Sequence, residues 1–118
     1  MARLLFGIAG VVGLAMSLTV ASAVVTAPAL ADDSGFAYAH DLRKEKGRTC
    51  FSDHYHQGGG NGNTRKAAET EAIKSWSSFT AFEYGSDWAR FSKASGKGMS
   101  CSPGSSGWDC NVEARPCK

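Results

Sequence analysis

The chain has 118 residues, with 13 Lys and Arg against 11 Asp and Glu, so its formal net charge at pH 7 is +2. Basic residues form no run or stripe, which leaves nucleic-acid binding without an electrostatic basis. Four cysteines in so short a chain point instead to a small domain that depends on covalent cross-links.

Residues 1–31 have the order of a cleaved secretory signal peptide. Arg3 gives a positive start, residues 4–25 are almost wholly apolar or small, and Ala-Leu-Ala at 29–31 forms an A-x-A cleavage signature. The alternatives are cleavage after residues 21–23 and an uncleaved anchor helix, because the apolar run approaches the length of a membrane span. We expect bacterial export to a secreted or periplasmic location, with no membrane segment left after cleavage.

Cleavage would change the composition of the folded part. Loss of Arg3 lowers the net charge from +2 to +1, and most aliphatic residues leave with it. The large aliphatic residues that remain are Leu42, Ile73, Met99 and Val112, whereas aromatic residues recur from Phe36 to Trp108. The core must therefore be built from aromatic rings.

The segment before the first strong pattern is polar. Residues 32–48 are predicted to form a flexible polar arm, with at most a short helix over 39–46. Residues 49–57 have the β-branched and aromatic character of a short strand, and the glycine-rich residues 58–63 read as a turn. The small disulfide-stabilised domain is assigned to residues 49–118.

A long amphipathic helix is predicted from about Arg65 to Tyr84. The Thr64 hydroxyl can cap its start, and Gly85 suits the residue just past its end. Apolar residues recur at helical spacing along one stripe. The stripe consists of Ala68, Ala72, Ile73, Trp76 and Phe79, widened by Phe82 and Tyr84.

Strand signals follow the helix. Residues 88–94 fit either a strand or a second short helix capped by Ser86, and we favour the strand. Residues 108–114 alternate between apolar and polar side chains, as a half-buried strand does. If residues 104–107 form a hairpin loop, Cys101 lies opposite Cys110 and Met99 lies opposite Val112.

The hairpin register predicts the disulfide pairing. Cross-strand neighbours on one face are separated by a distance that a disulfide can span, which pairs Cys101 with Cys110 and leaves Cys50 with Cys117. A one-residue slip of the strands would undo this pairing. A zinc site built from the four cysteines is disfavoured because close C-x-x-C pairs are missing.

These elements predict an α+β fold. We expect one long amphipathic helix packed on a small antiparallel three-stranded meander, with two disulfides as staples. Aromatic rings of the helix would cover the apolar face of the sheet.

The stretch from Asp53 to Thr64 carries the main site hypothesis. His54 and His56 lie one residue apart, so they share a face of an extended chain and could begin a site for a divalent transition metal. Asp53 and His40 could add ligands. The competing interpretation is two surface histidines in a polar loop, and no other cofactor is expected.

Catalytic and nucleotide-binding motifs are missing from the sequence. No serine lies in a G-x-S-x-G elbow, paired cysteines would leave no free thiol, and Asn63 stands where a P-loop needs a lysine. An enzyme is therefore the less favoured class.

Three functions remain. The first is an exported binding or structural interaction module with an unknown protein, peptide or glycan partner, recognised through one or two aromatic rings exposed on the sheet. The second is a metal-binding protein that uses His54 and His56. The third is a small hydrolase-like enzyme whose site is assembled only by folding.

Overall fold

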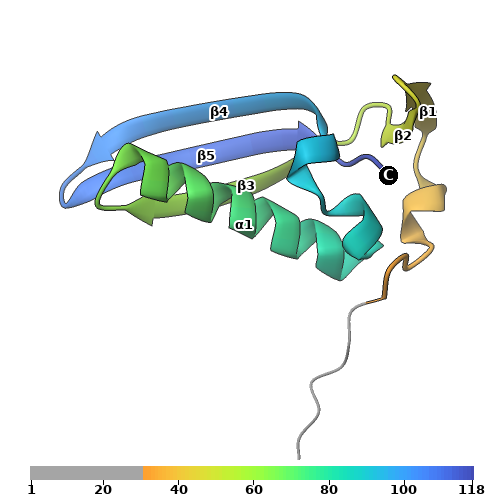
Figure 1. Cartoon of the computed structure of the whole chain (residues 1–118), viewed down its shortest axis with the longest axis horizontal. Coiled ribbons are helices and arrows are strands. Elements are labelled where there is room, and N and C mark those ends of the chain that lie inside the picture. Colours follow the sequence, from red (N-terminus) through yellow and green to blue (C-terminus); the bar gives the residue numbers. More distant parts are fainter. Residues whose placement is uncertain (1–30) are drawn as a thin grey trace, which may run out of the picture.

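A computed structural model of the chain describes residues 31–118. Residues 1–30, which hold nearly all of the expected signal peptide, lie outside the described residues. The described part has an α+β fold with one α-helix, two small antiparallel sheets and two disulfides (Figure 1). The predicted fold class is therefore confirmed, although the meander is not.

Nine elements follow one another within residues 31–118. They are η1 (Phe36–Ala39), β1 (Leu42–Glu45), β2 (Arg48–Phe51), β3 (His56–Gly62), α1 (Arg65–Tyr84), η2 (Ser86–Trp88), η3 (Phe91–Lys93), β4 (Ser95–Gly104) and β5 (Gly107–Arg115).

The larger sheet has the strand order β3-β5-β4, with both pairs antiparallel. The last strand of the chain therefore inserts between the other two, so the sheet is not a meander. The predicted strand over 88–94 is wrong, because this segment forms the two short 3₁₀ helices η2 and η3, which bury Trp88 and pack Phe91 against the core. Its place in the sheet is taken by β3.

Strand β3 occupies the segment that its glycines led us to predict as a turn. A Cβ atom at Gly58, Gly60 or Gly62 would fall within 3.0 Å of atoms of α1. These alternate glycines face the helix, since successive residues of a strand point to opposite faces. Glycine is used here for close approach of helix and strand backbones, and not for a turn.

Helix α1 has the predicted bounds, and its start is capped as expected. Thr64 Oγ1 accepts a hydrogen bond of 3.1 Å from the Ala67 amide, and Gly85 follows with a φ of 101°. The buried residues are Ala68, Ala72, Trp76, Thr80 and Tyr84. The buried stripe thus follows four-residue spacing.

Two residues of the predicted stripe are exposed. Phe79 keeps 53% and Phe82 keeps 77% of its surface accessible. Where helix α1 meets the glycines of β3, the buried helix residues in contact are Ala68, Ala72 and Trp76. The buried stripe is therefore narrower than we predicted.

The hairpin of β4 and β5 has the predicted register. Cys101 lies opposite Cys110 and Met99 opposite Val112, and the turn runs from Gly104 to Gly107. The disulfides join Cys101 to Cys110 and Cys50 to Cys117, which are the pairs that this register indicates. Such bonds form and persist in an oxidising compartment.

Residues 39–46 do not form the short helix that we considered. Residues 42–45 form the strand β1 instead. It pairs with β2 across a tight turn at Lys46 and Gly47, which both have positive φ. Arg115 of β5 holds this hairpin against the sheet, because its guanidinium donates to Glu45 and to the Phe51 carbonyl.

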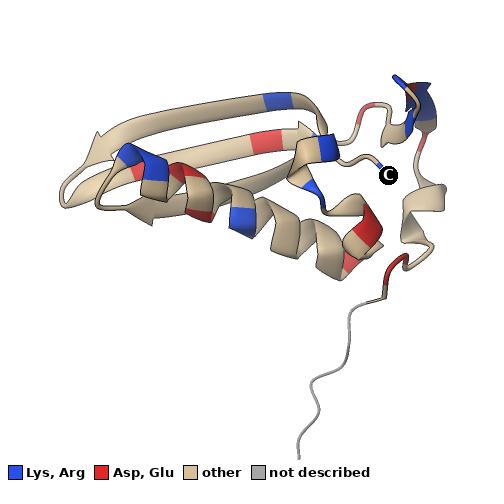
Figure 2. Ribbon diagram, viewed as in Figure 1, with Lys and Arg blue, Asp and Glu red and all other residues tan. Residues whose placement is uncertain are grey.

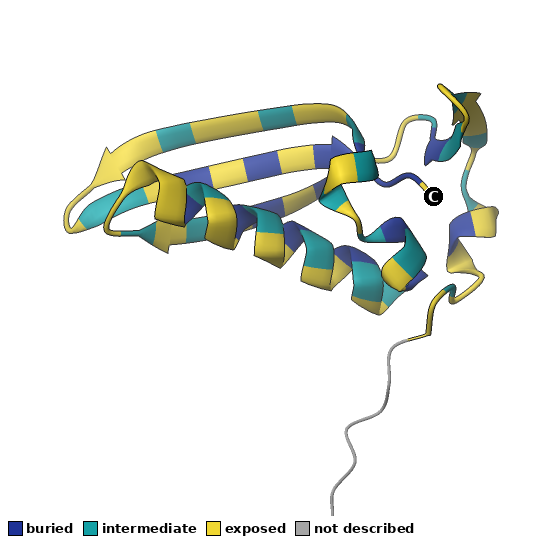
Figure 3. Ribbon diagram, viewed as in Figure 1, coloured by how far each residue is buried: buried dark blue, intermediate teal, exposed yellow. Residues whose placement is uncertain are grey.

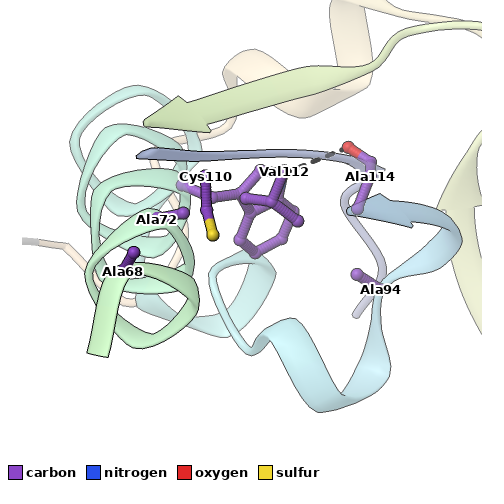
Figure 4. Close-up of a cluster of buried hydrophobic side chains, with 7 residues drawn as sticks. Ala68, Ala72, Ala94, Cys110, Val112 and Ala114 are labelled. Atoms are coloured by element: carbon purple, nitrogen blue, oxygen red, sulfur yellow. Dashed lines mark hydrogen bonds between the residues drawn. The ribbon is translucent and has the colours of Figure 1, made fainter. Parts of the chain in front are cut away.

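The core has two parts. One lies between α1 and the sheet, where the Trp76 indole donates a hydrogen bond of 3.2 Å to the Ala114 carbonyl (Figure 4). The other packs Ala37, Phe51, Tyr84 and Trp88 beside the β1–β2 hairpin. Buried positions line the sheet-facing side of α1 along its whole length (Figure 3). No helix within residues 31–118 has both the length and the apolar character of a membrane span.

Candidate functional site

The histidine cluster consists of His40, His54 and His56, which three different segments bring together. His40 follows η1, His54 lies in the loop after β2, and His56 begins β3. The ring centroids of His40 and His54 are 4.7 Å apart, and those of His54 and His56 are 5.0 Å apart. The predicted H-x-H pair is thus close in space, with His40 beside it.

His56 is nevertheless enclosed, with 2% of its surface exposed. Because the Thr80 hydroxyl donates to the Trp76 carbonyl, its oxygen accepts from His56 Nδ1 at 3.2 Å. His56 Nε2 lies 3.4 Å from the Tyr84 hydroxyl and 3.3 Å from Glu83 Oε2. Both ring nitrogens are therefore engaged within the protein.

Burial also sets the protonation state of His56. Loss of hydration lowers its pKa to about 4, although the nearby Glu83 carboxylate acts in the opposite direction. Burial likewise raises the pKa of the Tyr84 phenol above its usual range. The lowered pKa of His56 and the raised pKa of Tyr84 keep both side chains neutral near neutral pH.

The exposed side of the histidine cluster opens into a small pocket. Its volume is about 220 Å³, and His40, Asp41, Asp53 and His54 line it. In the described chain, the one set of three or more His, Cys, Asp or Glu donor atoms within 4.8 Å of one another comprises Glu69, Cys101 and Cys110. These two cysteines form a disulfide and do not offer thiolates.

The two edges of the larger sheet differ in how they are protected. Strand β4 carries Lys97, Pro103 and a register shift between Ser95 and Gly98, which all hinder the addition of another strand. Strand β3 has the sequence HQGGGNG, without Lys, Arg, Asp, Glu or Pro, and its register with β5 is unbroken. The β3 edge thus lacks the features that hinder strand addition, whereas the β4 edge has three of them.

A shallow groove of about 380 Å³ runs beside the open edge. This β3 groove is lined by Gln57, Gly58, Gly59, Ser75, Phe79 and Asn111. The C-terminal half of α1, which borders the groove, carries no charge from Ser75 until Glu83, and β3 has none either (Figure 2). The groove is therefore an uncharged surface with backbone groups on one side and an aromatic ring on the other.

The exposed aromatic rings do not lie where we expected them. We expected them on the sheet, but the exposed Phe and Tyr side chains of the described residues lie on α1, on η1 and in the loop before β3. They are Phe36, Tyr38, Tyr55, Phe79 and Phe82. Phe79 contacts His56, with ring centroids 5.0 Å apart. The β3 groove and the histidine cluster are thus neighbours that share this contact.

Sequence reasoning missed the edge strand because three of its glycines, Gly58, Gly59 and Gly60, are consecutive and show no alternation in the sequence. The packing of helix α1 against Gly58, Gly60 and Gly62 distinguishes these positions from Gly59, and it appears only in the folded chain. Asp41 was also missed as a neighbour of His54, because the segment around it was expected to be a flexible polar arm.

Comparisons of the chain with protein-family models, with curated proteins and with solved structures found no match. Its function must therefore be argued from its own surfaces.

Proposed function

We propose that this protein is an exported binding module that recognises an extended, uncharged peptide segment of a partner protein at the β3 groove. The observation that carries this proposal is the contrast between the open β3 edge and the protected β4 edge. The two disulfides and the expected signal peptide support a secreted or periplasmic location.

Strand addition would supply the affinity. An edge strand presents unpaired amide and carbonyl groups, and an extended peptide can hydrogen-bond to them while its alternate side chains enter neighbouring pockets. In this protein the apolar side chain that lines the groove is Phe79 on α1, and the exposed Phe82 follows it about one turn farther along the helix. Because the groove carries no charge, the preferred segment is apolar or neutral.

A second copy of the chain fits this edge poorly. Helix α1 lies directly over β3, since a Cβ atom at Gly58 or Gly60 would overlap the helix backbone. Two copies joined edge to edge would place their β3 strands about 4.8 Å apart. Their two helices would then be closer than the ~8–10 Å that packed helices need. A peptide brings no helix of its own and avoids this clash.

Two lysine substitutions test the proposal. Gly59 and Ser100 lie on opposite sides of the same β5 residue, Asn111. A Cβ at Gly59 meets only the Asn111 side chain, at 3.5 Å, and Ser100 is exposed, so both positions accept a side chain. Gly59→Lys places a charge on the open edge, whereas Ser100→Lys is its matched control on the protected edge.

The probe is a phage-displayed library of random linear peptides selected on the oxidised protein. We expect selected peptides to be uncharged, and we expect Gly59→Lys to weaken their binding by about tenfold or more. Phe82→Ser should weaken binding less, and Ser100→Lys should leave it within about twofold.

Three results would contradict the proposal. The first is a selection that enriches nothing, and the second is a set of peptides that bind Gly59→Lys as well as they bind the wild type. The third is a concentration-dependent dimer in sedimentation that Gly59→Lys abolishes, since this would assign the edge to a second copy.

A further inference from the structure

The pocket beside His40 lies at the base of the β1–β2 hairpin. The sequence places His40-Asp41 immediately before β1, and Asp53-His54 two residues after β2, in mirrored order. Leu42 pairs with Phe51, and the Ser52 amide donates a hydrogen bond of 2.9 Å to the Asp41 carbonyl. The antiparallel ladder thus brings two His–Asp pairs, separated by eleven residues, to one place.

The position of the hairpin base is held from two sides. Cys50, near the end of β2, is bonded to Cys117, and the Arg115 guanidinium donates to the Phe51 carbonyl. His40 is oriented by the Tyr84 hydroxyl, which lies 3.2 Å from its Nε2 atom. The backbone at the pocket is therefore fixed, while the exposed side chains of Asp41, Asp53 and His54 can rotate.

The ligand atoms at this pocket are not already used. In residues 31–118, ring nitrogens of histidine form hydrogen bonds only at His40 and His56, which leaves both nitrogens of His54 available. No Lys, Arg or His nitrogen in the same part of the chain pairs with Asp41 or Asp53. Two unpaired carboxylates next to two imidazoles give the pocket a charge that suits a divalent cation.

We propose that His40, Asp41, Asp53 and His54 bind one divalent transition-metal ion of the Zn²⁺ class. Two imidazole nitrogens and two carboxylate oxygens form an ordinary four-coordinate set for zinc. The Tyr84 hydroxyl at His40 supplies the outer contact that commonly orients a ligating ring. A pocket of about 220 Å³ has room for the ion and for water that it keeps.

Binding requires the exposed side chains to turn inward. No three of the four side chains place donor atoms within 4.8 Å of one another in the structure, so the exposed Asp41, Asp53 and His54 must change rotamer to share an ion with His40. Ordering these side chains lowers the affinity relative to a preformed site, and we expect binding in the micromolar range. His56 takes no part, since both of its nitrogens are engaged inside the protein.

This assignment differs from the H-x-H pair in a measurable way. A site built on the pair would need His56 and would tolerate the loss of His40. A site at the hairpin base needs His40 and tolerates the loss of His56, because that ring faces Thr80 and Tyr84.

The experiment is a titration of the oxidised protein, prepared without chelator or histidine tag, with ZnCl₂ in a calorimeter. We expect one ion per chain, with affinity lowered about tenfold or more in each of His40→Ala, His54→Ala and Asp53→Asn. Asp109→Asn, an exposed carboxylate on β5, is the matched control and should keep the wild-type affinity.

A second readout avoids the question of whether variants fold. In carbon–proton correlation spectra of the wild type, ZnCl₂ should shift the imidazole signals of His40 and His54 until one equivalent is reached. The proposal is overturned by signals that do not shift, by binding that does not saturate, or by an affinity that His54→Ala leaves unchanged. It is also overturned if His56 shifts while His40 does not.

Discussion

The two edge strands of the larger sheet, β3 and β4, are held in place by different interactions. Strand β4 is held to β5 by a disulfide, and Arg115 and Glu45 meet Ser95 at its start. Strand β3 has no cross-link, and it is held by helix α1, which its glycines allow to approach as closely as backbone permits. An edge strand can therefore be fixed firmly from its face while its outer backbone groups are left without a partner strand.

The largest effect is expected where the helix meets β3. Gly60→Val places a side chain against the backbone of Ala68 and Ala72, so helix and strand must separate. We expect the free energy of unfolding to fall by about 4 kcal/mol or more. Urea denaturation monitored by tryptophan fluorescence measures this change. A loss below about 1 kcal/mol would show that the close approach does not hold β3 in place.

The disulfides should rank by the length of chain that they close. Cys50–Cys117 spans 67 residues and Cys101–Cys110 spans 9, so loss of the first releases more entropy in the unfolded chain. Paired Cys→Ala variants should lose about 4 and about 3 kcal/mol, respectively, in urea denaturation. A larger loss of stability on removal of Cys101–Cys110 would mean that this disulfide also stabilises β4 in the folded state, in addition to its effect on the entropy of the unfolded chain.

An acid titration tests the contacts of the Glu45 carboxylate with Arg115 and Ser95, at the start of β4. Hydrogen bonds from Arg115, Ser95 and Arg43 lower the pKa of Glu45 to about 2, from an ordinary value of 4.5. The folded state thus binds this proton less readily than the unfolded state does. The stability from Glu45 is therefore fully present above pH 4.5 and is lost as the pH falls toward 2.

Glu45→Gln should lower stability at pH 7 and flatten this acid dependence. Denaturation midpoints at pH 7, 4 and 3 measure both effects, and Glu113→Gln, on the exposed face of β5, is the control. Parallel pH profiles for the wild type and Glu45→Gln would contradict the assignment.

The smallest effect is expected on the outer face of β3. Gly59→Ala adds a methyl group that touches only the Asn111 side chain, at 3.5 Å, and it restricts the unfolded chain. We expect a change between zero and a gain of about 1 kcal/mol. Comparison of the stability of Gly59→Ala with that of Gly60→Val therefore distinguishes the exposed face of β3 from the face that packs on α1. A loss comparable to that of Gly60→Val would mean that both faces of β3 are packed.

The elements that could be predicted from the sequence are those determined by residues close together in the chain. The bounds of α1 followed from Thr64, Gly85 and the spacing of Ala68, Ala72 and Trp76, which all act within one helix. The register of β4 and β5 likewise followed from one short turn. Strand β3 could not be predicted in this way, because its glycines make sense only against a helix that follows it in the sequence.

The candidate sites show the same limit. His54 and His56 drew attention because they are close in sequence, yet folding buries His56 and turns His54 toward solvent. His40 and Asp41 join His54 through a hairpin that the charged sequence of residues 41–48 did not suggest. Phe79 and Phe82 are exposed because only a narrow part of the apolar stripe of α1 packs against the sheet. The spacing of residues along a helix does not predict how wide the buried part of such a stripe is.

Chemical-shift mapping can show whether a peptide binds at the β3 edge of the sheet. A labelled sample would be titrated with the tightest uncharged peptide from the selection, and amide shifts would be followed over the whole sheet. We expect the amides of residues 56–62 and of the α1 residues around Phe79 and Phe82 to shift, while the amides of β4 do not. Shifts centred on β4, or on neither edge, would contradict the claim that β3 is the recognition edge.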